Sequence, residues 1–238
     1  MLTLILVESS LEPVPKEILS HPQIQSYAKK VGKKPNQILL DKSYHYRAMG
    51  SLNLKEKRGR PDIIHLTLLE ALGSPLNLEG LLETYVHTLN DYVVYVNPKT
   101  RLPRNYNRFV GLMEQLFQTG KVPIEGEPLL TLKKLTLKQL LKKLKPTYVL
   151  ALTRKGKPQT PTQTAKKLAQ QKKPIVFIGG FPHGHFTNQT INLANEKICL
   201  DPTGLDTWIV ASRILAAYEE TIGLPEKRLQ KIQKKIKP

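Results

Sequence analysis

Residues 175–184 read IVFIGGFPHG. Four consecutive apolar residues, Ile175–Ile178, predict a strand that is buried on both faces, and the glycines and proline that follow predict a tight loop at its end. A second run, Lys197–Leu200, precedes another loop, DPTGL at residues 201–205. Loops at the carboxyl ends of neighbouring parallel strands are where α/β proteins hold small ligands. On spacing alone, two ordinary strand-to-helix turns explain the pattern equally well.

Similar apolar runs recur along the chain, separated by segments with helical periodicity. The further predicted strands are Thr3–Val7, Ile38–Leu40, Tyr92–Val96 and Tyr148–Leu152. The predicted helices are Ile63–Leu72, Tyr106–Phe117, Thr162–Gln171 and Thr207–Ile222. This alternation predicts an α/β fold with a largely parallel sheet. No repeat or long linker divides the chain, so we expect a single domain over residues 1–238.

Residues 81–97 break the alternation. Leu81–Thr88 and Tyr92–Val96 are both rich in β-forming residues, and only Leu-Asn-Asp separates them. This pattern is typical of a β-hairpin, and we expect it to be an antiparallel excursion at a sheet edge.

Two segments are strongly basic. Within Lys133–Lys145, leucines recur on one helical face and lysines surround them. We favour a helix that docks on the core with a solvated lysine face over a helix that lies on a membrane surface. The tail, Glu226–Pro238, is also basic and predicts a helix that frays at its end.

The chain carries 37 Lys and Arg against 19 Asp and Glu, a net charge of +18. Such an excess favours a polyanionic partner, either nucleic acid or an acidic membrane surface. The single cysteine, Cys199, excludes an internal disulfide and a zinc site built from several thiolates. The opening residues, MLTLILVESS, are too short an apolar run for a signal peptide or a membrane span, so we expect a protein of a reducing compartment.

Residues 58–65 read RGRPDIIH. Pro61 suits the first turn of a helix, and Asp62 complements the positive end of the helix dipole. Arg58 and Arg60 oppose that dipole, so helix chemistry does not explain them. Arginines held at such a position suit a phosphate or an electron-rich base.

A row of arginines follows the strand that ends at Asn97. Arg101, Arg104 and Arg108 are spaced by three and then four residues, which places them on one side of a turn and the helix it enters. Such a row matches successive phosphates of one nucleic-acid strand, and Tyr106 is placed to stack on a base. We favour RNA or DNA contact over an ordinary solvated face.

Signatures of other chemistries are missing from the sequence. It contains no GxGxxG after a strand, no GxxxxGK[ST], no HExxH and no GxSxG. His183 and His185 are two residues apart, but no third ligand stands at a convincing spacing, so we expect no metal site.

Four segments together resemble the pseudouridine N1-specific methyltransferase family of small-subunit ribosome biogenesis, a member of the SPOUT, or α/β-knot, superfamily. They are RGRPDIIH (58–65), LLEALGSPLN (68–77), VNPKTRLPRNYNRFVGLMEQL (96–116) and IGGFPHG (178–184). The resemblance covers about half of the chain. It implies a trefoil-knotted α/β domain, a homodimer, S-adenosylmethionine as the cofactor and an rRNA hairpin as the substrate.

The resemblance also assigns roles to residues. Arg60 and Asp62 match the family's base-contacting arginine and the acid that holds it. Arg101, Arg104 and Arg108 match its rRNA-contacting residues. The positions that match its cofactor-binding loops are Thr153, Gly179, Gly184, Leu200, Asp201, Pro202, Thr203, Gly204 and Leu205. The family reads Ser-Asn-x-Pro where this chain reads Asp-Pro-Thr-Gly, so we expect the contacts of that loop to come from its backbone.

From the resemblance we expect methylation of the N1 position of a pseudouridine in small-subunit rRNA. Arg60, oriented by Asp62, stabilises the charge that develops on the base. Asp62 as the base is the less favoured version, because a carboxylate paired with an arginine is a poorer base. The alternative function is an RNA-binding assembly factor that does not need methyl transfer. The expected partners are the rRNA hairpin, a second copy of the chain and other small-subunit assembly proteins; we expect a cytoplasmic location and no membrane contact.

Overall fold

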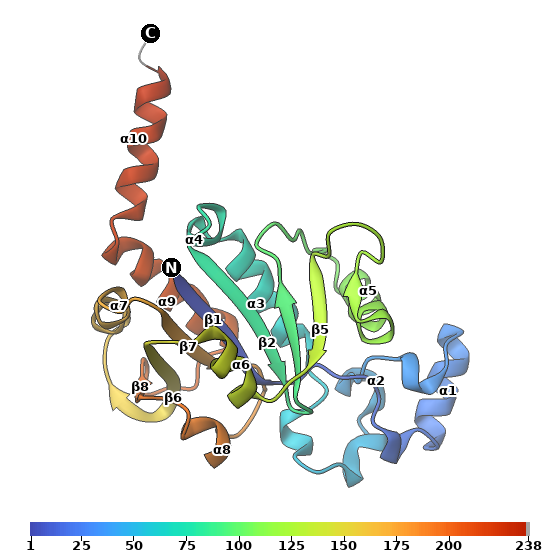
Figure 1. Cartoon of the computed structure of the whole chain (residues 1–238). Helices are drawn as coiled ribbons and strands as arrows, with labels where there is room; N and C mark the ends of the chain where they lie inside the picture. The colour runs from blue at the N-terminus through green and yellow to red at the C-terminus, as the bar shows by residue number, and fades with distance from the viewer. Residues whose placement is uncertain (237–238) are drawn as a thin grey trace.

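In a computed structural model of the chain, the backbone is described for residues 1–236 and the side chains for residues 1–231. One sheet of eight strands runs through the described residues in the order β4-β5-β3-β2-β1-β7-β6-β8 (Figure 1). The strands are β1 (Leu2–Ser9), β2 (Leu82–Thr88), β3 (Tyr92–Val96), β4 (Lys121–Val122), β5 (Leu130–Lys134), β6 (Tyr148–Pro158), β7 (Pro174–Gly179) and β8 (Glu196–Cys199).

Side chains of the central strand β1 alternate between two apolar layers. Leu4 and Leu6 face a cluster that includes residues of α3 (Pro61–Gly73), α5 (Tyr106–Thr119), α7 (Pro161–Ala169) and α9 (Thr207–Thr221). Ile5 and Val7 face the other cluster, which includes residues of α6 (Leu137–Leu144) and lies beside α8 (Asn188–Ile191). The period-two alternation of β1 therefore buries both faces of the sheet, as the apolar run predicts.

The predicted α/β architecture is confirmed, and the hairpin prediction is confirmed in part. β2 and β3 pair as an antiparallel hairpin, but β2 also pairs in parallel with β1, and β3 continues into β5 and β4. The hairpin is therefore the start of an antiparallel half of the sheet rather than an edge. Leu130–Lys134 is a strand that the sequence does not predict, because its lysines resemble the flank of the helix that follows.

One predicted element is absent from the sheet, and another begins later than predicted. Ile38–Leu40 is no strand of the sheet; only Leu39 forms a single bridge, to Pro13. These buried residues instead support the segment that contains α1 (Pro22–Val31) and α2 (Lys42–His45). The basic helix begins at Leu137, not at Lys133, because Thr136 caps it and the residues before it pair with β3.

The docked interpretation of that basic helix is correct. Leu137 and Leu140 are buried, and Leu141 and Leu144 pack against the same apolar cluster. The leucine face is therefore part of the core, and the lysines remain toward solvent.

The C-terminal helix α10 (Leu224–Ile236) projects from the body of the molecule (Figure 1). Its first turns contact the body through Glu79, which accepts hydrogen bonds from Arg228 and Lys231. The predicted basic tail is therefore helical as far as Ile236, and residues 237–238 lie outside the described residues. Among the described residues, no helix combines the length and the apolar character needed to cross a bilayer.

The end of β6 curls around β8. Ile198 of β8 pairs with Leu152 and also with Lys157, five residues farther along β6. Between them, Gly156 lies so close that a Cβ atom there would stand 2.5 Å from the backbone nitrogen and carbonyl carbon of Ile198. β8 therefore lies between two parts of the same strand, and only glycine permits this crossing.

Gly156→Ala should disrupt this crossing, because the added methyl group would meet backbone, which has no rotamer to change. We expect a loss of at least about 1–3 kcal/mol in the free energy of unfolding, and poor recovery of folded protein. Gly73→Ala is the matched control, since no atom lies within 4 Å of its added Cβ. Thermal unfolding of both variants checks this; equal midpoints would contradict the crossing.

Candidate functional site

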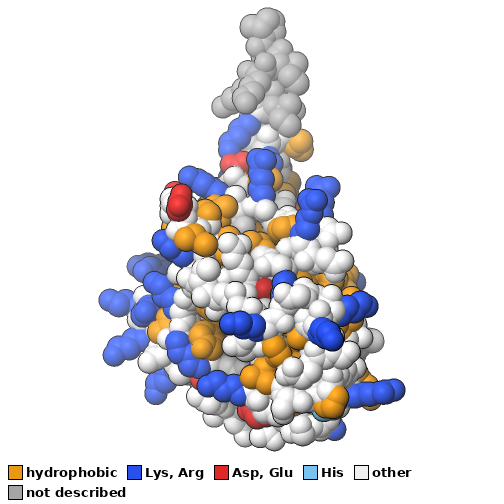
Figure 2. Space-filling model, turned by 90° about the vertical axis from the view of Figure 1, so that its right-hand side faces the viewer, with side chains coloured by type: hydrophobic (Ala, Val, Ile, Leu, Met, Phe, Trp, Pro, Cys, Tyr) orange, Lys and Arg blue, Asp and Glu red, His pale blue; other side chains and the backbone are white. Residues whose placement is uncertain are grey.

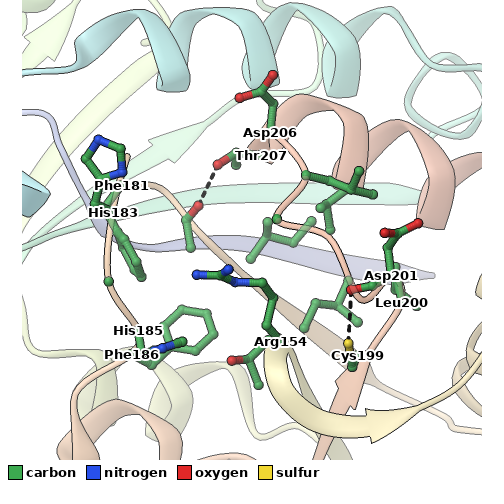
Figure 3. A pocket seen from close by; sticks show the side chains of 18 of the residues that line it. Arg154, Phe181, His183, His185, Phe186, Cys199, Leu200, Asp201, Asp206 and Thr207 are labelled. Atoms are coloured by element: carbon green, nitrogen blue, oxygen red, sulfur yellow. Dashed lines mark hydrogen bonds between the residues drawn. The ribbon is translucent and has the colours of Figure 1, made fainter.

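A cavity of about 440 Å³ opens where the loops after β7 and β8 meet the middle of β6 (Figure 3). We call it the main cavity. The residues predicted from the cofactor-loop match that line it are Thr153, Gly179, Gly184, Leu200, Asp201, Thr203, Gly204 and Leu205. Pro202 does not line it and is exposed. The predicted set is therefore gathered in one place, apart from that proline.

The lining combines apolar walls with a few charged groups. Ile178, Phe181 and Phe186 supply apolar surface, whereas Asp206 and Arg154 supply opposite charges. Figure 3 shows the Arg154 side chain extending from the middle of β6 into the cavity. A concave site that combines apolar and polar lining suits a small molecule with both kinds of surface, and its volume lies in the usual range of about 300–1,000 Å³.

Glycines bring backbone to the cavity surface. Gly184 has φ +97°, a conformation that side chains rarely adopt. A Cβ at Gly179 would lie 2.9 Å from the Phe181 ring, and one at Gly204 would lie 3.5 Å from the Arg154 guanidinium. The conformation at Gly184 therefore favours glycine, and the three glycines leave backbone uncovered at the cavity surface.

Local hydrogen bonds hold the loops after β7 and β8 together. Thr207, at the start of α9, donates its hydroxyl to the carbonyl of Gly179 at 2.8 Å (Figure 3). Asp201 accepts from the backbone nitrogen of Thr203 at 2.9 Å, and the Cys199 thiol donates to the Asp201 carbonyl. The cavity rim is therefore ordered by its own side chains.

A buried lysine contacts the loop after β7 and helps to hold its conformation. Lys57 donates hydrogen bonds to Glu8 and to the carbonyl of His185, and its ammonium lies 4.3 Å from the centre of the Phe181 ring. Its side chain is only 5% exposed. Lys57 also immediately precedes the Arg58–Arg60 segment, so it joins that segment to the cavity.

Glu8, at the end of β1, completes this buried contact. It accepts from both the backbone nitrogen and the hydroxyl of Thr187, each at 2.8 Å. Burial raises the pKa of the Glu8 carboxyl, but hydrogen bonds from Lys57, Thr190 and Thr187 outweigh burial and hold that pKa below its ordinary value. Glu8 is therefore ionised and holds Thr187, at the far end of the loop, beside Lys57.

Arg60 and Asp62 form a bidentate pair. The guanidinium Nε donates to Oδ1 at 2.8 Å, and a second nitrogen donates to Oδ2 at 2.7 Å. The hydrogen bond to Asp62 raises the pKa of Arg60, and Asp206 adds to this from the cavity rim. Such a fork–fork pair sets the plane of the guanidinium as well as its charge.

Ser10 connects this pair to the main cavity. Its hydroxyl accepts from the Arg60 backbone nitrogen at 2.7 Å, and its own nitrogen donates to the Gly180 carbonyl at 2.7 Å. Only one residue therefore lies between Arg60 and the glycine loop after β7. Asp206 lines the cavity and its charge also raises the pKa of Arg60, so the arginine and the cavity belong to one site.

The arginine row lies beside this site. Arg101, Arg104 and Arg108 are exposed, and none has an ion-pair partner among the side chains that the structure describes. His65 of α3 bonds the Pro103 carbonyl at 2.7 Å, which ties the row to the helix that Arg60 caps. Figure 2, which views the side where α1 and α5 lie, shows many Lys and Arg side chains and few acidic ones.

One sequence interpretation, that of Arg58, changes in the structure. Arg58 is turned inward and pairs with the buried Glu12 at 3.6 Å, so it stabilises the fold rather than facing a phosphate. The Tyr106 hydroxyl donates to Asp41, so its ring is held in place from one end. Among the described residues, no group of three or more His, Cys, Asp and Glu is placed to hold a metal ion.

Comparison with known proteins places the chain in a family. The model of the EMG1/NEP1 methyltransferase family matches residues 4–219. The chain belongs to the EMG1/NEP1 methyltransferase family. This confirms the family and the enzyme class predicted from the four segments.

Relatives of this family match over nearly the whole chain. Two proteins named ribosomal RNA small subunit methyltransferase Nep1 are 46% identical (Staphylothermus marinus; 94% of this chain, 97% of the relative) and 47% identical (Pyrococcus furiosus; 92% and 96%). The crystal structure of Archaeoglobus fulgidus Nep1 bound to S-adenosylhomocysteine is 38% identical, with a TM-score of 0.82 over 93% of this chain and 98% of that one. The predicted fold class is therefore confirmed.

Several residues of this EMG1/NEP1 site are not evident from the sequence. Glu8 and Lys57 are far apart in the chain and belong to no motif, so no local signal indicates their pairing. Asp206 could be found in part from the sequence, because an aspartate directly before a predicted helix is expected at the N-cap. In the structure its side chain makes no capping hydrogen bond and is free to line the cavity. Arg154 directly follows the predicted Thr153, but no sequence pattern singles it out.

Lys57→Met should weaken binding at the main cavity, because the loop after β7 loses its support. Removing one partner of a buried ion pair costs about 3–5 kcal/mol of folding free energy. We expect about tenfold weaker S-adenosylhomocysteine binding, measured by calorimetry well below the unfolding midpoint. Lys55→Met, an exposed lysine in the same short turn, is the control. Unchanged affinity in folded Lys57→Met would show that the loop does not need this contact.

Proposed function

We propose that this protein transfers a methyl group from S-adenosylmethionine to the N1 position of a pseudouridine in small-subunit rRNA. One observation carries the proposal: Ser10 joins the Arg60–Asp62 pair to the glycine loop that lines the main cavity, through one hydrogen bond to each. Relatives that are 46% and 47% identical carry the name of a small-subunit rRNA methyltransferase.

The main cavity fits S-adenosylmethionine. Its apolar walls suit an adenine ring, and the glycine loops let backbone groups approach the ligand. The Arg154 guanidinium suits the carboxylate of the methionine part of S-adenosylmethionine. The carboxylates of Asp201 and Asp206 suit the ammonium group and the ribose hydroxyls of the same ligand. A solved relative is bound to S-adenosylhomocysteine, the product of methyl transfer, which agrees with the predicted cofactor.

When bound, S-adenosylmethionine supplies an electrophilic methyl group on a sulfonium sulfur. The acceptor is the ring N–H that pseudouridine has and uridine lacks, and it gives up its proton to solvent as the nitrogen–methyl bond forms and the methyl–sulfur bond breaks. Arg60 lies where it stabilises the negative charge that develops on the base. The target base must leave its stack to reach this place, so the protein acts on an extruded nucleotide.

Asp62 orients Arg60. Both of its carboxylate oxygens accept hydrogen bonds from the guanidinium, which leaves neither aimed freely at a substrate proton. The pair is therefore a preorganised donor, and much of the remaining catalysis comes from holding the acceptor nitrogen in line with the methyl group.

The arginine row positions the RNA. Arg101, Arg104 and Arg108 are exposed and have no described acidic partner, so their charges remain available for phosphates. The same three arginines would serve equally in the alternative function, an assembly factor that binds rRNA without needing methyl transfer. The glycine-lined cavity favours the enzyme. The homodimer, other assembly partners and the cytoplasmic location stay predictions.

The central test of the function compares two RNA hairpins that differ only by pseudouridine against uridine. The protein should transfer labelled methyl to the first and not to the second. Arg60→Ala should lower the single-turnover rate at saturating RNA by about 10²–10³-fold, since a preorganised donor is removed. Binding of both hairpins without transfer to either would favour the assembly-factor alternative.

The pH dependence of Asp62→Asn separates the two roles of Asp62 within the same assay. If Asp62 orients Arg60, the residual rate of the variant still rises with pH as the ring nitrogen ionises. If Asp62 is the base, the wild type has a low-pH limb that disappears in the variant. A double variant no slower than Arg60→Ala alone supports a shared unit, whereas strictly additive effects contradict it.

The triple variant Arg101→Ala, Arg104→Ala, Arg108→Ala should bind RNA more weakly and with a flatter salt dependence. The slope of log K against log salt should fall by about one unit for each phosphate that the variant no longer neutralises. Saturating RNA should restore part of the methyl-transfer rate, because the row positions rather than reacts. An unchanged slope would make the row an ordinary solvated surface.

A further inference from the structure

A second cavity lies between α1, α2 and the first turns of α5. Its volume is about 360 Å³, and it shares no lining residue with the main cavity. Three tyrosines line it: Tyr27 of α1, Tyr44 of α2 and Tyr106 of α5. We call it the tyrosine cavity.

Two of the tyrosines stack on each other, and the third is held by Asp41. The rings of Tyr27 and Tyr44 stack at 4.8 Å between centroids, with 26° between their planes. Tyr44 remains 44% exposed, so part of its ring surface is free. The Tyr106 hydroxyl donates to Asp41, which fixes the third ring. Preformed aromatic surface of this kind suits stacking with another flat ring.

The charges that line the tyrosine cavity determine which part of a nucleotide it can hold. Two buried carboxylates line the cavity: Asp41, which accepts from the Tyr106 hydroxyl, and Glu114, which accepts from the Leu39 nitrogen at 3.0 Å and from Lys33. Their negative charge disfavours a phosphate inside. Lys30 is an exposed lining residue and places positive charge toward solvent, whereas Lys33 pairs with Glu114. A nucleotide whose neutral base lies inside the cavity and whose phosphate lies outside it matches this arrangement of charges.

The tyrosine cavity adjoins both RNA-facing parts of the site. The Lys42 nitrogen donates to the Gly59 carbonyl at 2.8 Å, which places α2 directly against the residue before Arg60. Tyr106 stands in the chain between Arg104 and Arg108. An RNA strand that runs along the arginine row toward Arg60 therefore passes the mouth of this cavity.

We propose that the tyrosine cavity binds an unpaired nucleobase of the substrate RNA, from a nucleotide near the target in the same loop. The proposal rests on the proposed function in one respect, that the substrate is an RNA hairpin. A base held by stacking would fix the register of the loop while the target base is extruded toward Arg60. Stacking of a base on an aromatic side chain changes binding by about 5- to 150-fold.

The experiment is a cycle between protein and RNA changes. Tyr44→Ala and Tyr44→Phe are each combined with hairpins in which one loop nucleotide at a time is abasic, leaving the target pseudouridine intact. One abasic position should weaken wild-type binding by about 5- to 150-fold and have no further effect in Tyr44→Ala. Tyr44→Phe should behave as the wild type, because the ring rather than the hydroxyl stacks.

Tyr46→Ala is the matched control, because Tyr46 is even more exposed, at 67%, yet does not line the cavity. S-adenosylhomocysteine affinity, measured in each variant, reports the integrity of the fold at the separate main cavity. Equal weakening in Tyr46→Ala, or additive effects at every abasic position, would overturn the proposal.

The outcomes also separate this proposal from the proposed function. Selective methyl transfer to the pseudouridine hairpin without coupling to Tyr44 overturns the base site alone. Coupling at one nucleotide supports the base site even where methyl transfer is absent. A wild type that binds neither hairpin overturns both.

Discussion

Ser10 and Glu8, at the end of β1, hold the two halves of the site against each other. Ser10 bonds Gly180 on one side and Arg60 on the other, and Glu8 bonds Thr187 and Lys57. These groups are buried, where a polar group without a partner costs about 1–3 kcal/mol. The loop after β7 and the Arg60 segment therefore cannot move apart without breaking several bonds. Methyl transfer requires such fixed placement, because small displacements of reacting groups are costly in rate.

The large positive charge of the chain serves two different purposes. Lys57 and Arg58 are turned inward and pair with Glu8 and Glu12, so these cations stabilise the fold. The arginine row is exposed and has no described acidic partner, so its charge remains available to a polyanion. Net charge alone does not distinguish these uses, because both contribute equally to the sum. Only the position of each side chain relative to buried carboxylates separates them.

Much of the fold follows from local patterns. The apolar runs of β1, β6 and β7 and the stripe of α9 are strong signals, since burial on both faces or on one stripe leaves a periodic trace. The errors fall where the trace is short. Ile38–Leu40 is buried without a sheet partner, and the lysines of β5 resemble part of α6 because a lysine-rich strand end and a helix flank look alike in sequence.

The family, the glycine loops and the arginine pair can be recognised in the sequence, because these depend on residue type at fixed spacing along one segment. The meeting of distant residues is evident only in the folded chain: Glu8 with Lys57, Ser10 with Arg60, Gly156 with Ile198, and Tyr27 with Tyr44. Such pairings join residues 17 to 50 positions apart, as the residue numbers show. Their contact energies depend on three-dimensional approach and burial, which no single stretch of sequence records.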